Sequence, residues 1–213
     1  MKRTLVIATG SFILPSVDQL IAQGQIECIG LVTQPARPVG RNQELQRTPA
    51  AAWAQQRGIQ VFEYEKLTPH LDEILTLNIE SVLVGDVGLI IPKRLLEAFP
   101  NQVINLHGSL LPSYRGASPI PQAILDGQTE TGITWMIVEP EIDAGPMITS
   151  RKLPIEPNDT TTTLYARLAA LAALDVTEVL SQYWSNPRPL IPQDQSRATF
   201  TKKISREDGH ATW

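Results

Sequence analysis

Short apolar runs rich in Val and Ile alternate with helix-like segments through the first two thirds of the chain. This alternation limits the fold more than any other feature, because strand, crossover helix and parallel strand form the repeating unit of sheets covered by helices. The apolar runs occupy residues 4–9, 26–33, 59–62, 81–84 and 103–106, and the helix-like segments are 15–23, 49–57, 68–77 and 92–99. We therefore predict an α/β fold, Rossmann-like, with a mostly parallel twisted sheet and helices on both faces.

The order of elements changes after residue 117. We expect a helix over 120–125 and two strands over 133–138 and 147–155, paired as a hairpin or at the sheet edge. Asp159 or Thr160 is a good N-cap for a long helix whose apolar positions keep helical spacing. Beyond it the chain is Pro-rich and polar, which is typical of a surface-draped tail or the start of a linker. The expected organisation is one domain over 1–185 and a tail over 186–213.

Composition narrows the function classes. With 213 residues, 42% of them hydrophobic, the chain can bury a substantial core. Lys and Arg number 18 against 22 Asp and Glu, so the net charge of −4 provides no global basic field, and any nucleic-acid contact has to be local. One cysteine, Cys28, and three histidines argue against a disulfide or a metal site. No run of about 18 apolar residues and no complete signal peptide occur, so we expect a cytoplasmic protein outside the membrane.

An amide and an imidazole end the apolar run that starts at residue 103. Asn105 and His107 are two residues apart, so both side chains leave the same face of the expected strand. In open α/β sheets, ligands bind beyond the carboxyl ends of the strands, which is where this pair falls. The alternative is a turn-capping Asn and a hydrogen-bonded loop His. The loop that follows, over residues 108–117, contains Gly and Pro residues of the kind that arrange backbone amides around a ligand, which favours a ligand site.

A carboxylate partner follows the strand expected over 133–138. Glu139 and Glu141 fit solvated loop charges, whereas Asp143 precedes an Ala-Gly pair that lets the chain approach closely. Asp143 is therefore the candidate to hold and polarise His107. A Ser-His-Asp hydrolase built on Ser109 is the competing arrangement, but Ser109 lacks a Gly-x-Ser-x-Gly elbow and lies only two residues from the histidine.

The motifs of the chain resemble those of the folate-dependent formyltransferases, most closely the catalytic N-terminal domain of the branch that acts on methionyl-tRNA. The resemblance covers essentially the whole sequence. It is carried by Asn105-Leu106-His107-Gly108-Ser109-Leu110-Leu111-Pro112, Asp143-Ala144-Gly145, Gly88-Leu89-Ile90-Ile91-Pro92 and Gln34-Pro35-Ala36-Arg37-Pro38-Val39-Gly40-Arg41. The first two patterns are specific to the superfamily, and the last points to the tRNA branch.

The resemblance implies transfer of a formyl group from 10-formyltetrahydrofolate to a primary amine, without a metal. It implies that Asn105 and His107 stabilise the formyl oxygen and that Asp143 orients His107 and helps to move a proton. It assigns the folate contacts to two loops. These are Gly88, Leu89, Ile90, Ile91 and Pro92, and Ser109, Leu110, Leu111 and Pro112.

The acceptor implied by the resemblance is initiator methionyl-tRNA, with Arg37 and Arg41 as candidate contacts that a solvated loop would also explain. Three positions depart from the family pattern. The loop at residues 10–12 is shorter, Asn42-Gln43-Glu44 replaces a Gly-Lys-Lys element, and Gly85-Asp86-Val87 stands where the family has an apolar residue, Ala and Tyr. Asp86 is either an ordinary strand-end acid or a new functional carboxylate. The sequence ends at Trp213, before the small tRNA-binding β-barrel domain of the family.

Three other functions are compatible with these motifs. One is formylation of a nucleotide-linked amino sugar, which the weakened basic loop favours and the segment 34–41 opposes. The others are hydrolysis of formyltetrahydrofolate and a non-catalytic folate-binding module. Retention of Asn105, His107 and Asp143 argues against loss of catalysis.

Overall fold

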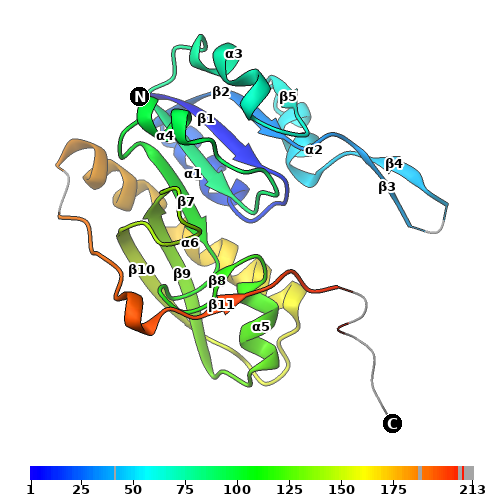
Figure 1. The fold of residues 1–213 in the computed structure, drawn as a ribbon, viewed down its shortest axis with the longest axis vertical. Helices are drawn as coiled ribbons and strands as arrows, with labels where there is room; N and C mark the ends of the chain where they lie inside the picture. Colours follow the sequence, from blue (N-terminus) through cyan, green and yellow to red (C-terminus); the bar gives the residue numbers. More distant parts are fainter. Residues whose placement is uncertain (41, 187–188, 206–207, 209–213) are drawn as a thin grey trace.

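A central sheet of seven strands organises the chain, whose residues 1–40, 42–186, 189–205 and 208 are described in a computed structural model (Figure 1). The strands are β1 (Lys2–Ala8), β2 (Ile26–Thr33), β5 (Val61–Glu63), β6 (Ser81–Gly85), β7 (Val103–His107), β9 (Glu130–Ile137) and β10 (Met147–Pro154). Their order is β10-β9-β7-β6-β1-β2-β5. The strands from β7 to β5 run parallel, while β9 is antiparallel to both of its neighbours. The predicted mostly parallel α/β fold is confirmed.

Helices cover both faces of this sheet. One face is packed by α1 (Leu14–Ala22), α2 (Pro49–Gln56), α5 (Pro119–Leu125) and α6 (Thr161–Ser185), and the other by the 3-10 turn Thr68–His70, α3 (Leu71–Leu75) and α4 (Lys93–Ala98). Alternate residues of β1 enter the two cores: Val6 lies in the cluster with Leu20 and Leu168, whereas Leu5 lies in the cluster with Ile74. This alternation follows from the two-residue period of a strand buried on both sides.

Most predicted elements lie close to their expected positions. β2 has the predicted bounds, Pro15 lies in the first turn of α1, and Thr160 caps α6 with its hydroxyl on the Thr163 amide. β9 and β10 form an antiparallel pair with β10 at the sheet edge, so both expectations for these strands hold. The helix expected over 68–77 is shorter: it starts as the 3-10 turn Thr68–His70 and continues as α3 to Leu75. Within the described residues, no helix has the length and apolar character that a bilayer crossing requires.

Two small strand pairs were not predicted. β3 (Arg37–Val39) and β4 (Glu44–Gln46) form an exposed antiparallel hairpin that projects from the body (Figure 1). β8 (Arg115–Gly116) pairs in parallel with β11 (Phe200–Thr201). The segment after α6 therefore returns across the loop that follows β7. It packs so closely there that a Cβ on Gly116 would lie 2.4 Å from the Thr201 carbonyl oxygen.

Candidate active site

A cavity of about 930 Å³ opens at the carboxyl ends of β1, β6 and β7. The chain leaves β1 toward β2 on one side, while β6 and β7 extend the sheet on the other, so this edge is the topological switch point where α/β sheets bind ligands. Thr9 and Gly10 line the cavity after β1, residues 86–91 after β6 and residues 105–108 at the end of β7. The volume is within the range of about 300 to 1,000 Å³ typical of small-molecule sites.

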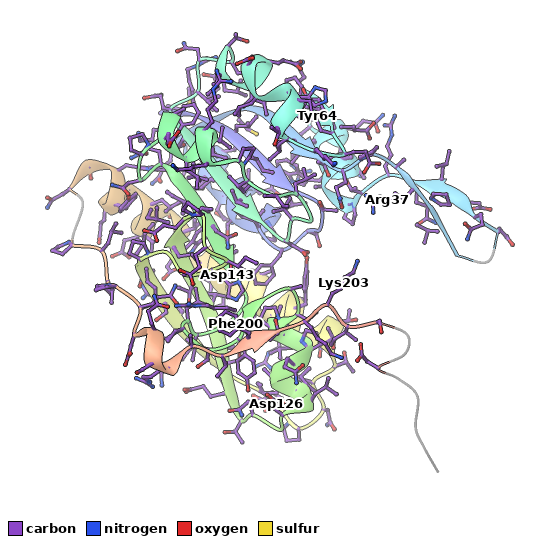
Figure 2. All side chains as sticks on the ribbon, viewed as in Figure 1. Arg37, Tyr64, Asp126, Asp143, Phe200 and Lys203 are labelled. Atoms are coloured by element: carbon purple, nitrogen blue, oxygen red, sulfur yellow. The ribbon has the colours of Figure 1, made fainter. Side chains whose placement is uncertain are left out.

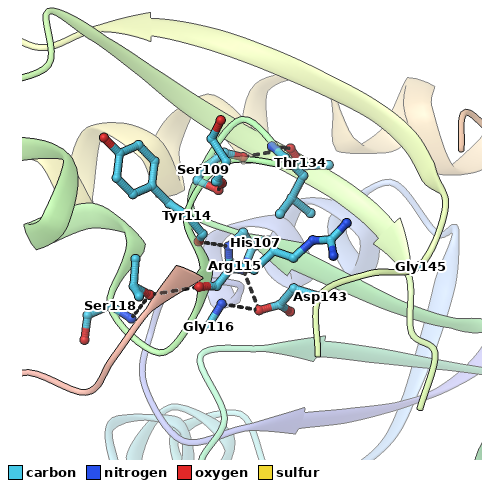
Figure 3. Close-up of polar contacts among 12 residues, drawn as sticks. His107, Ser109, Tyr114, Arg115, Gly116, Ser118, Thr134, Asp143 and Gly145 are labelled. Carbon is cyan, nitrogen blue, oxygen red and sulfur yellow. Dashed lines mark hydrogen bonds and ion pairs between the residues drawn. The ribbon is translucent and has the colours of Figure 1, made fainter. Parts of the chain in front are cut away.

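His107 is the buried titratable group of this cavity. Its Nε2 lies 2.9 Å from the Tyr114 carbonyl oxygen. Since a carbonyl only accepts, Nε2 carries a hydrogen and donates it. The other nitrogen, Nδ1, lies 3.7 Å from Oδ2 of Asp143 (Figure 3). The ring is thus oriented by backbone on one side and faces the carboxylate with the other.

Asp143 reaches this position from the loop between β9 and β10. Its Oδ2 accepts a 2.8 Å hydrogen bond from the Gly116 amide, in the same loop that carries the Tyr114 carbonyl. Asp143 also has a positive φ of 48°, a left-handed conformation that a residue with a side chain adopts only when its surroundings hold it there. The His107–Asp143 pair predicted from sequence is therefore brought together, at a distance slightly longer than a hydrogen bond.

Asn105 lies two positions before His107 on β7, and both line the cavity. The sequence argument that these two side chains leave one face of the strand agrees with this placement. Ser109, in contrast, is fully buried, and its hydroxyl donates to the Ser113 carbonyl at 2.6 Å. Because His107 is oriented by Tyr114 and Ser109 by Ser113, the structure gives no support to a Ser-His-Asp hydrolase (Figure 3).

A second carboxylate stands at the cavity wall. Asp86 follows β6, and its Oδ2 accepts a 2.6 Å hydrogen bond from the Tyr165 hydroxyl, which in turn accepts the Ser11 amide at 3.0 Å. Burial, and after it the Asp86 charge, raise the pKa of the Tyr165 phenol above its ordinary value. Asp86 thus lines the cavity and, through Tyr165, connects the loop after β1 to α6. The sequence alone did not show whether Asp86 enters the cavity.

Comparison with known proteins decides the family. A family model described as formyl transferase matches residues 2–180. Methionyl-tRNA formyltransferases of Listeria innocua and Staphylococcus aureus are each 37% identical over the whole chain, which spans 68% of their length. The chain belongs to the formyl transferase family.

Solved structures agree with this fold. Glycinamide ribonucleotide transformylase 1 of Geobacillus kaustophilus is 26% identical with a TM-score of 0.69, covering 84% of this chain and 97% of its own. An N-formyltransferase of Helicobacter canadensis, solved with folinic acid and dTDP-3-aminofucose, has a TM-score of 0.71 at 20% identity, covering 98% of this chain and 72% of its own. At that identity, the second likeness shows a shared fold.

The predicted folate contacts of this formyl transferase domain divide into two groups. Gly88, Leu89, Ile90 and Ile91 line the cavity. The described lining does not include Pro92, Ser109, Leu110, Leu111 or Pro112. These five residues begin α4 or shape the loop behind the cavity, where the Leu111 amide donates to Thr134. Their expected contact with folate stays a prediction.

Of the two predicted acceptor contacts, only Arg37 is described by the structure, and it lies away from the cavity. Arg37 is on the exposed β3–β4 hairpin, where it pairs with Glu65 at 3.0 Å, and Figure 2 shows it far from Asp143. Arg41 lies outside the described residues. Sequence reasoning missed Tyr165 and Gln34 as lining residues. Gln34 begins the Gln-Pro-x-Arg-Pro segment, so a signal for it existed, whereas Tyr165 sits within an amphipathic helix and gave none. In the described part of the chain, no group of three or more His, Cys, Asp or Glu is arranged for a metal ion.

Proposed function

We propose that this domain transfers the formyl group of 10-formyltetrahydrofolate to the amino group of methionyl-tRNA. The observation that carries the proposal is the convergence of Asn105, His107 and Asp143 on one cavity at the carboxyl edge of the sheet. An amide donor, an imidazole and a carboxylate are the groups that acyl transfer to an amine needs.

The cavity fits a folate donor, which would supply an activated one-carbon group. Main chain from residues 88–91 borders it and offers peptide donors and acceptors to the edge of a pterin, while the buried Leu89 supplies apolar contact. The volume of about 930 Å³ accommodates a ligand of that size beside Asn105 and His107.

Each of the three side chains has a distinct role in this reaction. As the amine attacks the formyl carbon, negative charge grows on the formyl oxygen, and the amide of Asn105 donates a hydrogen bond to it. Removing such a donor costs about 100- to 1,000-fold in kcat. A proton has to move from the attacking nitrogen to the folate nitrogen as the old carbon–nitrogen bond breaks. His107 Nδ1 and Asp143 Oδ2, which lie 3.7 Å apart, handle this proton.

Methionyl-tRNA is the acceptor that the relatives favour, since proteins of that name align over the whole chain. The β3–β4 hairpin, which carries Arg37, is the element we propose for phosphate contact; in the sequence, Arg41 falls between its strands and Arg47 follows β4. We place the reaction in the cytoplasm. The amino-sugar acceptor is kept as an outcome of the test.

The test is an acid-gel assay of initiator methionyl-tRNA incubated with the domain and 10-formyltetrahydrofolate. We expect formylation by the unmodified chain and loss of about 100- to 10,000-fold in kcat with His107→Ala. Ser109→Ala serves as the control and retains most activity, because its hydroxyl bonds only within its own loop. Formylation of dTDP-linked amino sugars without formylation of tRNA would reject the acceptor, and loss of activity with Ser109→Ala as complete as with His107→Ala would reject the mechanism.

A further inference from the structure

A buried amide from the segment after α6 joins the two loops that carry the candidate active site. Gln193 is 8% exposed. Its Nε2 donates to the carbonyl oxygens of Asp143 at 2.8 Å and Gly145 at 2.7 Å. Its Oε1 accepts from Nε and Nη2 of Arg115, at 3.0 and 2.7 Å. One side chain therefore bridges the loop between β9 and β10 and the loop after β7.

The chemistry of these partners fixes the orientation of the amide. Peptide carbonyls only accept and a guanidinium only donates, so the nitrogen of Gln193 faces the carbonyls and its oxygen faces Arg115. Both N–H groups and both lone pairs of the amide are used. A carboxylate of the same shape could serve Arg115 but could not donate to Asp143 and Gly145.

Arg115 anchors the other end of this bridge. Its side chain is 1% exposed, and within the described residues no carboxylate lies within 4.0 Å of it. Nη1 of Arg115 donates to Gln195 Oε1 at 2.8 Å, and the backbone amide of Arg115 donates to the Thr199 carbonyl. The residues on either side of Arg115 are the ones that touch the catalytic pair: Tyr114 accepts from His107, and Gly116 donates to Asp143.

We propose that Gln193 is a positioning residue for formyl transfer, which holds the Asp143 loop against the His107 loop and so sets the carboxylate beside the imidazole. The proposal rests on the proposed function and assigns Gln193, from the segment after α6, to the support of the catalytic pair. The strained backbone of Asp143 requires such support, and the two carbonyls that Gln193 binds lie at and just beyond Asp143. A displacement of about 1 Å at a catalytic group can cost about 100-fold in rate.

The isosteric variant Gln193→Glu separates positioning from simple structural support. At pH 8 the new carboxylate strengthens the contact with Arg115 while it abolishes both donors to the Asp143 loop. We expect kcat to fall about 10- to 100-fold. KM for 10-formyltetrahydrofolate is expected to change by less than about twofold, because residues 88–91 belong to another loop. Gln195→Ala is the matched control: it also removes a bond to Arg115 but leaves both carbonyl contacts, so kcat should stay near that of the unmodified chain.

Hydrogen exchange of the Gly116 amide provides a readout that needs no activity. This amide is bonded to Asp143, so Gln193→Glu should speed its exchange at least tenfold while the amides of β1 and β6 keep theirs. If Gln193→Glu does not fold, Gln193→Asn, one carbon too short to reach both loops, is measured in the same way. Unchanged kcat with unchanged Gly116 exchange in the folded variant would overturn the proposal. Absence of formylation by the unmodified chain would instead reject the proposed function. The Gly116 exchange would still show whether Gln193 holds the Asp143 loop against the His107 loop.

Discussion

Gly10 and Asp86 constrain each other at the cavity wall. A Cβ built on Gly10 would lie 1.7 Å from Oδ2 of Asp86, which is held in place by the hydroxyl of Tyr165. Any side chain at position 10 therefore has to displace the carboxylate and break its hydrogen bond. The shortened loop after β1 and the acid after β6, noted separately in the sequence, form one coupled feature.

This coupling predicts the outcome of a double-mutant cycle. Gly10→Ala should lower the free energy of unfolding by about 1 to 2 kcal/mol, the cost of a hydrogen bond to a charged group near the surface. In an Asp86→Ala background the same change should cost less than about 0.5 kcal/mol, since no carboxylate stands in the way. Urea denaturation of the four proteins measures both values. Equal costs in the two backgrounds would show that the contact does not limit position 10.

Cys28 offers a second prediction at this scale. Burial raises the pKa of its thiol from 9.0 to about 12, an effect that a backbone hydrogen bond at Gly30 partly opposes. The thiolate population at pH 8 therefore falls about a thousandfold. We expect Ellman's reagent to label Cys28 readily in urea and very slowly in the native protein.

The same shift makes stability depend on alkaline pH. The native state keeps its proton above pH 9 while the unfolded state loses it, so this contribution to stability is present below about pH 9 and is lost as the pH rises toward about 12. Cys28→Ala should flatten that part of the stability profile. A profile equally steep in the variant would assign the loss to other groups.

Whether an element could be predicted depended on where its stabilising contacts come from. β2 was located from sequence because its run of Ile, Leu and Val is buried along the strand, and α1 because Pro15 and Gly24 mark its ends. The β3–β4 hairpin gave no pattern of buried and exposed positions, since every residue of its two strands is exposed. β8 and β11 are two residues long and exist only through their contact with each other.

The N-terminus of α6 gives a prediction at the scale of the element. Thr160 and Thr163 form a reciprocal capping box, in which each side chain accepts from the backbone amide of the other. Thr160→Ala should therefore cost about 0.5 to 2 kcal/mol of unfolding free energy. Thr162→Ala is the control, an exposed first-turn threonine where Ala has the better helix propensity, and should change stability by less than about 0.5 kcal/mol. Similar losses in both variants would mean that the box contributes little.

At the scale of the whole molecule, the site combines residues that sequence could group with residues that it could not. The two-residue period of β7 placed Asn105 and His107 on one face of the strand. Asp143 joined them because it precedes an Ala-Gly pair in the turn after the strand expected over 133–138. Tyr165 and Gln193 come from 154 and 50 residues away from the groups they bind, and neither carries a motif. Sequence could therefore predict which polar groups meet at the cavity, whereas the contacts of Tyr165 and Gln193 depend on how the chain returns over the sheet.

Charge at the same scale predicts how tRNA binding responds to salt. The chain has a net charge of −4, so its phosphate contacts have to be local, and Nη2 of Arg37 is engaged in an exposed ion pair with Glu65. Arg37→Ala should raise KM for methionyl-tRNA and reduce the slope of log KM against log salt by about one. Glu65→Ala is the matched variant and should lower KM, because it frees the guanidinium and removes a repelling charge. Measurements of KM between 50 and 200 mM KCl test both, with KM for 10-formyltetrahydrofolate as the reference that neither variant changes. Unchanged tRNA kinetics in both variants would remove the hairpin from the acceptor site and leave the reaction chemistry untouched.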